Sequence, residues 1–216
     1  LMLGMEYYDN YKRGFEAKVL GGGEQDLRSA IEMIENVEAS GVRLLDDYRS
    51  VFDNDNKKNN EIIFSFYMER YETGNLSIAS NTTSRTDNLS MAVNLTDAAT
   101  SPNNSRHVYA PSEKVRSLYL KNKGDVRMDV ALIDMIDKDG NTILTQTNKF
   151  RGKDYTDDRY FDDDLIVYRW ADLLLLRAEA YAALGETAKA IADLDQIRNR
   201  AGLQGYSGHE DKLRLE

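Results

Sequence analysis

Hydrophobic and small residues recur at three- and four-residue spacing near the C-terminal end of the sequence, and this pattern predicts two helices. A first run, which ends at Gly185, places five such residues on one face: Ala171, Leu174, Leu175, Ala178 and Ala182. A second run follows this glycine: Ala188, Ile191, Leu194 and Ile197. Small side chains let two helix backbones approach closely, as in a tetratricopeptide repeat unit of about 34 residues. Residues 164–203 therefore predict a helical hairpin.

A second hairpin is predicted at the N-terminal end. Residues 26–39 place apolar side chains on one helical face, with Asp26 as a candidate N-cap and Gly41 just past the end. Residues 3–20 show a similar pattern and would supply the partner helix. We therefore expect residues 1–45 to form a helical hairpin.

The middle of the chain, residues 46–163, is expected to be a loop-rich insertion with short strands. β-Branched and aromatic residues favour strands at 61–67, 130–136 and 142–147, and Asp139-Gly140 is a turn signal between the last two. Residues 68–106 are rich in Asn, Ser and Thr, which is typical of loops. The predicted fold is a single domain over residues 1–216, mainly α, with tetratricopeptide-like helical hairpins, a loop-rich insertion and a few short β-strands.

Composition narrows the classes of function. The 216 residues have a net charge of −9, with 28 Lys and Arg against 37 Asp and Glu, which argues against nucleic acid as a partner because nucleic acid requires a basic surface. No cysteine is present, so no disulfide or cysteine-based metal site can form. The sequence opens without a basic and apolar leader, so we expect neither a secretion signal nor a transmembrane segment in it.

Several blocks of the sequence resemble one protein family. YRWADLLL at 168–175 and RNRAGL at 198–203 resemble the signature of the SusD/RagB family of outer-membrane nutrient-binding lipoproteins, with Trp170 in place of Tyr and Asp195 in place of Asn. Three upstream blocks resemble the family's sequence in the same order: SGVRL at 40–44 followed by Tyr48 and Phe52, NEIIFS at 60–65, and the block from Pro111-Ser112 to GDVR at 124–127.

The resemblance implies a binding protein that is not an enzyme and needs no cofactor. Proteins of this family sit on the outer surface of the Gram-negative outer membrane, capture oligosaccharides or other nutrients, and deliver them to a TonB-dependent, SusC-like transporter. The resemblance also implies that this sequence is the C-terminal part of such a protein, without the N-terminal portion. Contact with the membrane would be made only through an N-terminal lipid anchor that this sequence does not contain.

Carbohydrate sites combine exposed aromatic rings with polar side chains that donate and accept hydrogen bonds, because a sugar ring presents apolar C–H faces and a rim of hydroxyl groups. Such residues gather in and around the polar segment that follows residue 66. The candidate ligand-binding residues are Tyr67, Tyr71, Asn75, Asn81, Arg85, Asn88 and Tyr109.

Other candidate sites are weaker. A calcium loop beginning at Asp53 fails because Lys57 and Lys58 stand where an oxygen ligand and the turn glycine belong. An acidic cluster precedes the C-terminal hairpin, and we interpret it as a solvated face with a helix N-terminal charge bias in preference to a calcium site. Its members are Asp154, Asp157, Asp158, Asp162, Asp163 and Asp164. No metal site is therefore predicted.

Two alternative functions remain open. The helical hairpins could form a tetratricopeptide-type scaffold whose ligand is another protein. A glycoside hydrolase fragment is a third hypothesis, which would require two facing carboxylates about 5 to 9.5 Å apart. Within the family signature, Trp170 is expected to be buried against the helices. Arg169, Asp172, Arg198 and Arg200 are expected to maintain the fold through charge pairs between helix ends.

Overall fold

A computed structural model of the chain describes residues 23–71, 110–154 and 159–209. Helices dominate and strands are short, as the sequence predicts. The helices are α2 (Glu24–Ala39), α4 (Glu113–Lys121), α5 (Met128–Ala131), α6 (Trp170–Ala183) and α7 (Thr187–Arg200), with 3₁₀ turns η1 (Arg49–Phe52) and η2 (Asn54–Asn56). The strands are β1 (Ile62–Phe66), β2 (Leu132–Ile136), β3 (Thr142–Thr147), β4 (Lys153–Asp154), β5 (Arg159–Tyr160) and β6 (Leu165–Arg169).

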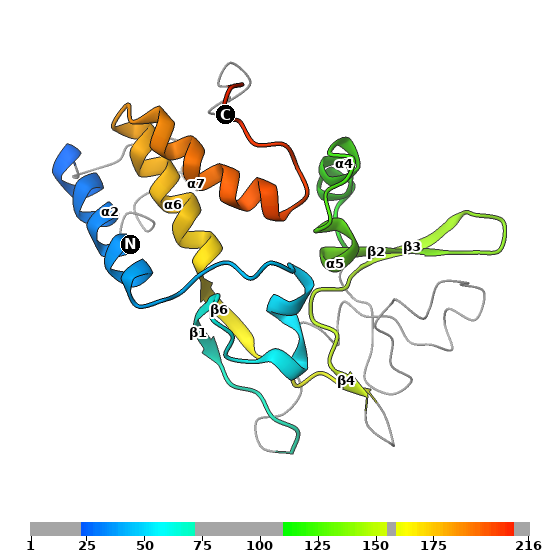
Figure 1. Cartoon of the computed structure of the whole chain (residues 1–216). Helices are drawn as coiled ribbons and strands as arrows, with labels where there is room; N and C mark the ends of the chain where they lie inside the picture. Colours follow the sequence, from blue (N-terminus) through cyan, green and yellow to red (C-terminus); the bar gives the residue numbers. More distant parts are fainter. Residues whose placement is uncertain (1–22, 72–109, 155–158, 210–216) are drawn as a thin grey trace, which may run out of the picture.

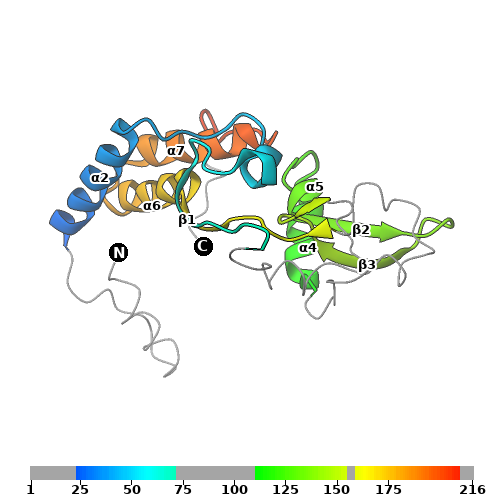
Figure 2. The ribbon, with the colours of Figure 1, turned by 90° about the horizontal axis from the view of Figure 1, so that it is seen from below.

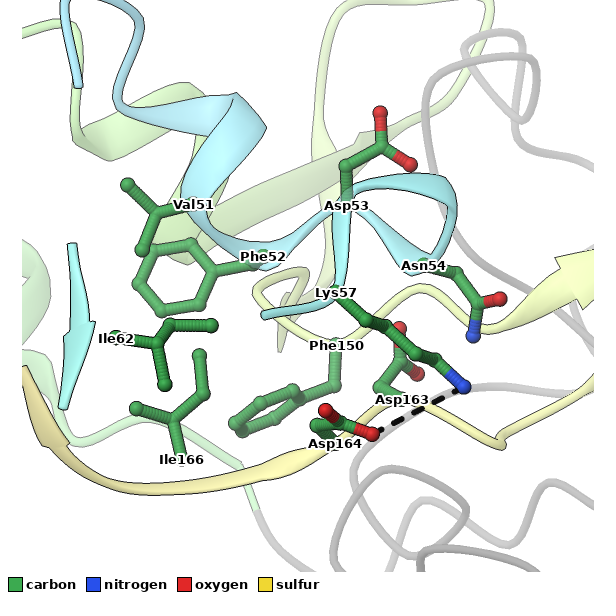
Figure 3. A pocket seen from close by; sticks show the side chains of 10 residues that line it. All are labelled: Val51, Phe52, Asp53, Asn54, Lys57, Ile62, Phe150, Asp163, Asp164 and Ile166. Atoms are coloured by element: carbon green, nitrogen blue, oxygen red, sulfur yellow. Dashed lines mark ion pairs between the residues drawn. The ribbon is translucent and has the colours of Figure 1, made fainter. Parts of the chain in front are cut away.

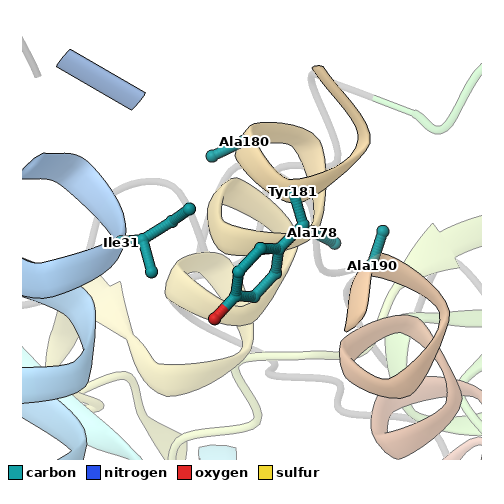
Figure 4. Close-up of a cluster of buried hydrophobic side chains, with 5 residues drawn as sticks. All are labelled: Ile31, Ala178, Ala180, Tyr181 and Ala190. Atoms are coloured by element: carbon teal, nitrogen blue, oxygen red, sulfur yellow. The ribbon is translucent and has the colours of Figure 1, made fainter. Parts of the chain in front are cut away.

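Helices α2, α6 and α7 pack side by side at one end of the molecule (Figures 1 and 2). Figure 4 shows the cluster between them, in which Ala178 and Ala190 are almost fully buried and allow α6 and α7 to approach closely beside Tyr181 and Ile31. Gly185, at φ +74°, ends the first helix of the pair. The predicted C-terminal hairpin is therefore confirmed. The partner helix expected at 3–20 lies outside the described residues.

The hairpin begins later than predicted, because the residues before Trp170 form a strand. Strand β6 pairs antiparallel with β1, with Phe64 opposite Tyr168 and Ile62 opposite Arg169. The β-branched and aromatic residues of 165–169 suit a strand. Their partner lies about a hundred positions earlier in the sequence, so the pairing is a tertiary contact that local periodicity does not indicate.

The other end of the molecule holds α4, α5 and the β2–β3 hairpin (Figure 2). Residues 132–136 and 142–147 pair antiparallel across the predicted turn, where Gly140 has φ +83°. Helices α4 and α5 were not expected, because residues 46–163 were assigned to loops and strands. Ser112 caps α4 by accepting a hydrogen bond from the Val115 amide. Within the described ranges, no helix combines the length and apolarity needed to cross a membrane.

Arg177 joins the three helices of the bundle through ion pairs. Its guanidinium donates two hydrogen bonds of 2.8 Å to Asp193 of α7 and one of 2.6 Å to Glu38 of α2. The side chain is almost fully buried and lies over Trp170, 5.5 Å from the ring centre. Trp170 is 2% exposed, which confirms its expected burial.

Glu61 joins strand β1 to the end of the α6–α7 hairpin. Its carboxylate is fully buried and accepts hydrogen bonds from Arg169 at the end of β6, from Arg200 at the end of α7 and from the Leu45 amide. The backbone carbonyl of Glu61 also accepts from the Trp170 amide at 2.8 Å. Arg169 and Arg200 therefore maintain the fold as expected, but their partner is Glu61 and not a residue at another helix end. Arg198 donates to the carbonyl of Gln204.

We predict that Glu61→Gln lowers the free energy of unfolding by about 3–5 kcal/mol. Glutamine keeps the shape of the side chain but removes the negative charge, which leaves two largely buried guanidinium groups without their counter-charge. Urea denaturation of the variant and the wild type measures the difference.

Glu32→Gln is the matched control. Glu32 is exposed on α2, so this change should alter the free energy of unfolding by less than about 0.5 kcal/mol. Equal stabilities of the Glu61 variant and this control would show that the buried network does not stabilise the fold.

Candidate functional site

Tyr67 directly follows strand β1 and presents its ring to solvent. Its side chain is 43% exposed, and its hydroxyl donates a hydrogen bond to Glu69 Oε2 at 2.6 Å. The ammonium nitrogens of Lys58 and Lys57 lie 4.7 and 5.3 Å from the ring centre. The ring is therefore partly exposed and has positive charge close to it.

The backbone after Tyr67 is held by buried polar groups. Lys57 Nζ donates to the Met68 carbonyl at 2.7 Å, and the Met68 amide donates to Asp164 Oδ1 at 3.1 Å. Lys57 and Asp164 also form an ion pair at 3.9 Å. These contacts fix the start of the segment that contains the predicted ligand-binding residues.

Tyr71 follows Met68 by three residues and forms a second aromatic group with Tyr160 of β5. The two ring centres are 6.5 Å apart and the ring planes are inclined by 38°. The guanidinium carbon of Arg70 lies 4.7 Å from the Tyr71 ring centre and 5.6 Å from that of Tyr160. Tyr71 is 82% exposed, so most of its surface is available to a ligand. We call Tyr67, Tyr71, Tyr160, Lys58 and Arg70 the tyrosine site.

Strained backbone marks two members of this site. Lys58 has φ +57° and Tyr71 has φ +70°, and they are the two non-glycine residues with positive φ in the described part of the chain. This conformation costs a bulky L-residue about 1–3 kcal/mol, and such residues cluster at binding and catalytic sites. The strain therefore supports a functional assignment for this surface.

The position of Tyr160 depends on the antiparallel pairing of β4 with β5. Lys153 pairs with Tyr160, and Gly152 precedes this pair with φ +64°. A Cβ atom on Gly152 would overlap the carbonyl oxygen of Tyr160. The Gly152 amide donates to Asp163 Oδ2 at 2.7 Å, which ties the β4–β5 pair to the buried residues before β6.

Asp162, Asp163 and Asp164 are at most 6% exposed, so their interpretation as part of a solvated acidic face is wrong. They do not adjoin a helix N-terminus, because strand β6 separates them from α6. Each instead accepts hydrogen bonds from the site's framework, including one from Asn54 to Asp162 at 2.9 Å. In the described part of the chain, no cluster of three or more metal-ligating side chains occurs.

A crevice lies between the η1–η2 turns and the β1–β6 sheet (Figure 3). Phe52, Ile62, Phe150 and their neighbours line one end, and the other end holds the ion pair that Figure 3 marks with a dashed line. The crevice has about 230 Å³ of empty space, part of which is open solvent, so the enclosed space is small. We therefore interpret it as a gap between packed elements that support the tyrosine site, and not as a ligand pocket.

A second exposed aromatic surface lies on the β1–β6 sheet. Phe64, Phe66 and Tyr168 are 47%, 55% and 47% exposed. The ring centre of Phe64 lies 5.3 Å from that of Phe66 and 6.5 Å from that of Tyr168. We call these three residues the sheet face. Two of its three rings are phenylalanines, which offer no hydrogen-bonding group, so the sheet face suits an apolar surface better than the hydroxyl rim of a sugar.

Two of the predicted ligand-binding residues, Tyr67 and Tyr71, lie in the tyrosine site. The other five lie outside the described residues: Asn75, Asn81, Arg85, Asn88 and Tyr109. The sequence analysis did not identify Tyr160, Lys58 or Arg70 as candidates. Phe64 and Phe66 were also missed, although their i, i+2 spacing in a predicted strand places them on one face.

The sequence profile of the SusD family matches residues 3–214. The chain belongs to the SusD/RagB family. No curated protein sequence matches the chain.

In the SusD/RagB signature, Asp195 stands where Asn is usual, and its two carboxylate oxygens accept hydrogen bonds from the amides of Tyr206 and Ser207 at 2.6 and 3.1 Å.

Solved structures with the same fold include NanU of B. fragilis, with a TM-score of 0.70 and 28% identity. The match covers 90% of this chain and 42% of NanU. A SusD superfamily protein from Bacteroides fragilis gives a TM-score of 0.72 at 22% identity, over 95% of this chain and 49% of its own. Surface glycan-binding protein A from Bacteroides thetaiotaomicron, solved in complex with laminarihexaose, gives 0.62 at 16% identity, over 83% and 44%. The chain thus spans less than half the length of these relatives.

We predict that stability depends on pH through Asp163. Burial raises the pKa of Asp163 from 3.8 to about 6, with the charge of Asp162 adding to the shift and the hydrogen bond from Gly152 opposing it. The folded state therefore binds this proton more tightly than the unfolded state, and the stabilisation that protonation gives is lost as the pH rises through about 6. When the pH is lowered from 7 to 5, the free energy of unfolding of the wild type should therefore rise by about 1 kcal/mol relative to that of Asp163→Asn, in which residue 163 does not titrate.

Urea denaturation at both pH values measures this difference, and Asp139→Asn in the exposed β2–β3 turn should show the pH dependence of the wild type. If the free energies of unfolding of the wild type and Asp163→Asn differ by the same amount at pH 5 and pH 7, the raised pKa of Asp163 is contradicted.

Proposed function

We propose that this SusD/RagB protein binds oligosaccharide at the tyrosine site without cleaving it. The observation that supports the proposal most directly is the exposure of Tyr67 and Tyr71 on a strained, well-anchored segment beside Tyr160. Aromatic rings pack against the C–H face of a sugar, and the tyrosine hydroxyls and neighbouring cations can donate to its hydroxyl groups.

The scaffold and the site have separate roles in this proposal. Helices α2, α6 and α7 with the Glu61 and Arg177 networks form a rigid body, and the site lies on a segment that extends from it. Binding residues placed on loops of a rigid scaffold are a common arrangement. The described residues that form the site require no metal or cofactor for this activity.

Family membership extends the proposal to the cell surface. We infer that the protein acts on the outer face of the outer membrane and delivers a glycan or another small nutrient to a TonB-dependent, SusC-like transporter. A fold shared with a surface glycan-binding protein supports this inference. Production of the protein in its host, followed by surface labelling and co-purification with the transporter, tests it.

We predict that Tyr71→Ala weakens oligosaccharide binding about tenfold, which corresponds to about 1.4 kcal/mol. The change removes one of two neighbouring rings while leaving the backbone anchors at Met68 in place. Affinity electrophoresis against a panel of soluble polysaccharides, followed by isothermal titration of the best ligand, measures the effect. Laminarihexaose is one soluble probe for the titration.

Tyr168→Ala is the matched control, because Tyr168 is an exposed tyrosine on the sheet face. Its binding should equal that of the wild type. Loss of binding in Tyr168→Ala with retention in Tyr71→Ala would move the glycan site to the sheet face. Absence of binding across the whole panel would reject the glycan proposal.

The sheet face favours a second candidate function, which is the docking of another protein. Three exposed aromatic side chains on a two-stranded sheet, with Phe64 in contact with both Phe66 and Tyr168, form the kind of apolar patch that protein partners cover. A scaffold role of this kind is compatible with glycan binding at the tyrosine site. A Phe64→Ser, Phe66→Ser double variant that keeps glycan binding but loses co-purifying protein would support it.

A further inference from the structure

The tyrosine site has a charge that differs from that of the protein as a whole. The chain has a net charge of −9. Even so, three cationic groups lie within 6 Å of the Tyr67, Tyr71 or Tyr160 ring centres: Lys57 at 5.3 Å, Lys58 at 4.7 Å and Arg70 at 4.7 and 5.6 Å. Cations are thus concentrated where the aromatic rings are exposed.

These cations are not equally available to a ligand. Lys57 is only partly exposed and is occupied by Asp164 and by the Met68 carbonyl. Arg70 is partly buried beside two tyrosine rings. Glu69 contributes one carboxylate to this surface, where it accepts the hydrogen bond of Tyr67. Lys58 is exposed, and among the described residues no carboxylate lies within ion-pairing distance of it. Lys58 is therefore the cation best placed to meet a charge on a ligand.

The backbone of Lys58 adopts a conformation that costs free energy. Its φ of +57° is unfavourable for a side chain with a Cβ atom, and glycine would adopt it freely. A lysine at this point presents an ammonium group 4.7 Å from the Tyr67 ring centre. Strained residues cluster at binding and catalytic sites, which supports a functional role for Lys58.

The chemistry of an ammonium group indicates the class of ligand. Neutral sugars are bound best by amides and carboxylates, which match hydroxyl groups that both donate and accept, whereas an ammonium group only donates and is strongly hydrated. Removing water from it is favourable when the ligand supplies a negative charge. A sugar with a carboxylate could place its ring on Tyr67 and its charge on Lys58.

We propose that the tyrosine site selects acidic saccharides, with a carboxylate bound by Lys58 and the sugar ring packed against Tyr67. This inference rests on the proposed glycan-binding function and specifies the ligand class of the same site. Lys58 is a specificity-determining residue in this assignment, and Arg70 extends the positive surface toward Tyr71 and Tyr160.

Pairs of saccharides that differ only in charge test the proposal. Trigalacturonic acid is titrated against its methyl ester, and sialylated lactose against lactose, with the wild-type chain at low salt. We expect at least one acidic member to bind about tenfold more tightly than its neutral counterpart. The preference should shrink in 0.5 M NaCl, because salt screens the interaction.

Three variants identify the source of the preference. Lys58→Gln should lower affinity for the acidic member by about three- to fivefold and leave the neutral member within twofold, whereas Lys58→Arg should restore acidic binding. Lys138→Gln, in the exposed β2–β3 turn, is the charge-matched control and should bind like the wild type.

The outcomes separate this inference from the proposed function. Equal affinity for acidic and neutral members, with both lowered by Tyr71→Ala, would overturn the charge selectivity and leave glycan binding at this site intact. An acidic preference that persists unchanged in Lys58→Gln would overturn the role of Lys58. Failure of all four saccharides and of the polysaccharide panel to bind would overturn both proposals.

Discussion

The fold depends on one buried carboxylate. Glu61 precedes strand β1 and receives Arg169 from the end of β6, Arg200 from the end of α7 and a backbone amide from the loop after α2. Three segments far apart in the sequence therefore meet at a single charge. Burying a carboxylate is costly, and two guanidinium groups offset that cost only in this arrangement, so the network fixes how the sheet joins the helical hairpin.

The position of the tyrosine site depends on this network. Strand β1 begins directly after Glu61 and ends directly before Tyr67, and β6 begins directly after Asp164 and ends at Arg169, so the same two strands connect the ion network to the anchors of the site. Asp163 and Gly152 then hold the β4–β5 pair that presents Tyr160. Rigid support of the backbone next to Tyr67 and Tyr160 limits the entropy lost when a ligand binds.

The two aromatic surfaces of the molecule differ in chemistry more than in exposure. The tyrosine site combines hydroxyl groups and cations with its rings, whereas Phe64 and Phe66 on the sheet face have no polar atoms. Hydroxyl-rich ligands and apolar protein surfaces need these different environments. In the functions proposed above, the tyrosine site binds the ligand and the sheet face contacts the partner.

The sequence by itself determined the elements whose signals are local. The periodic alanines and leucines with Gly185 predicted the α6–α7 hairpin, Asp139-Gly140 predicted the β2–β3 turn, and Tyr67 and Tyr71 were identified by residue type beside a polar segment. The tertiary structure decided what depends on distant contacts: the pairing of β6 with β1, the burial of Asp162–Asp164, and the placement of Tyr160 and Lys58 beside those tyrosines. A carboxylate has the same sequence signature in solvent and in a buried network, and only the folded chain supplies the partners that distinguish the two.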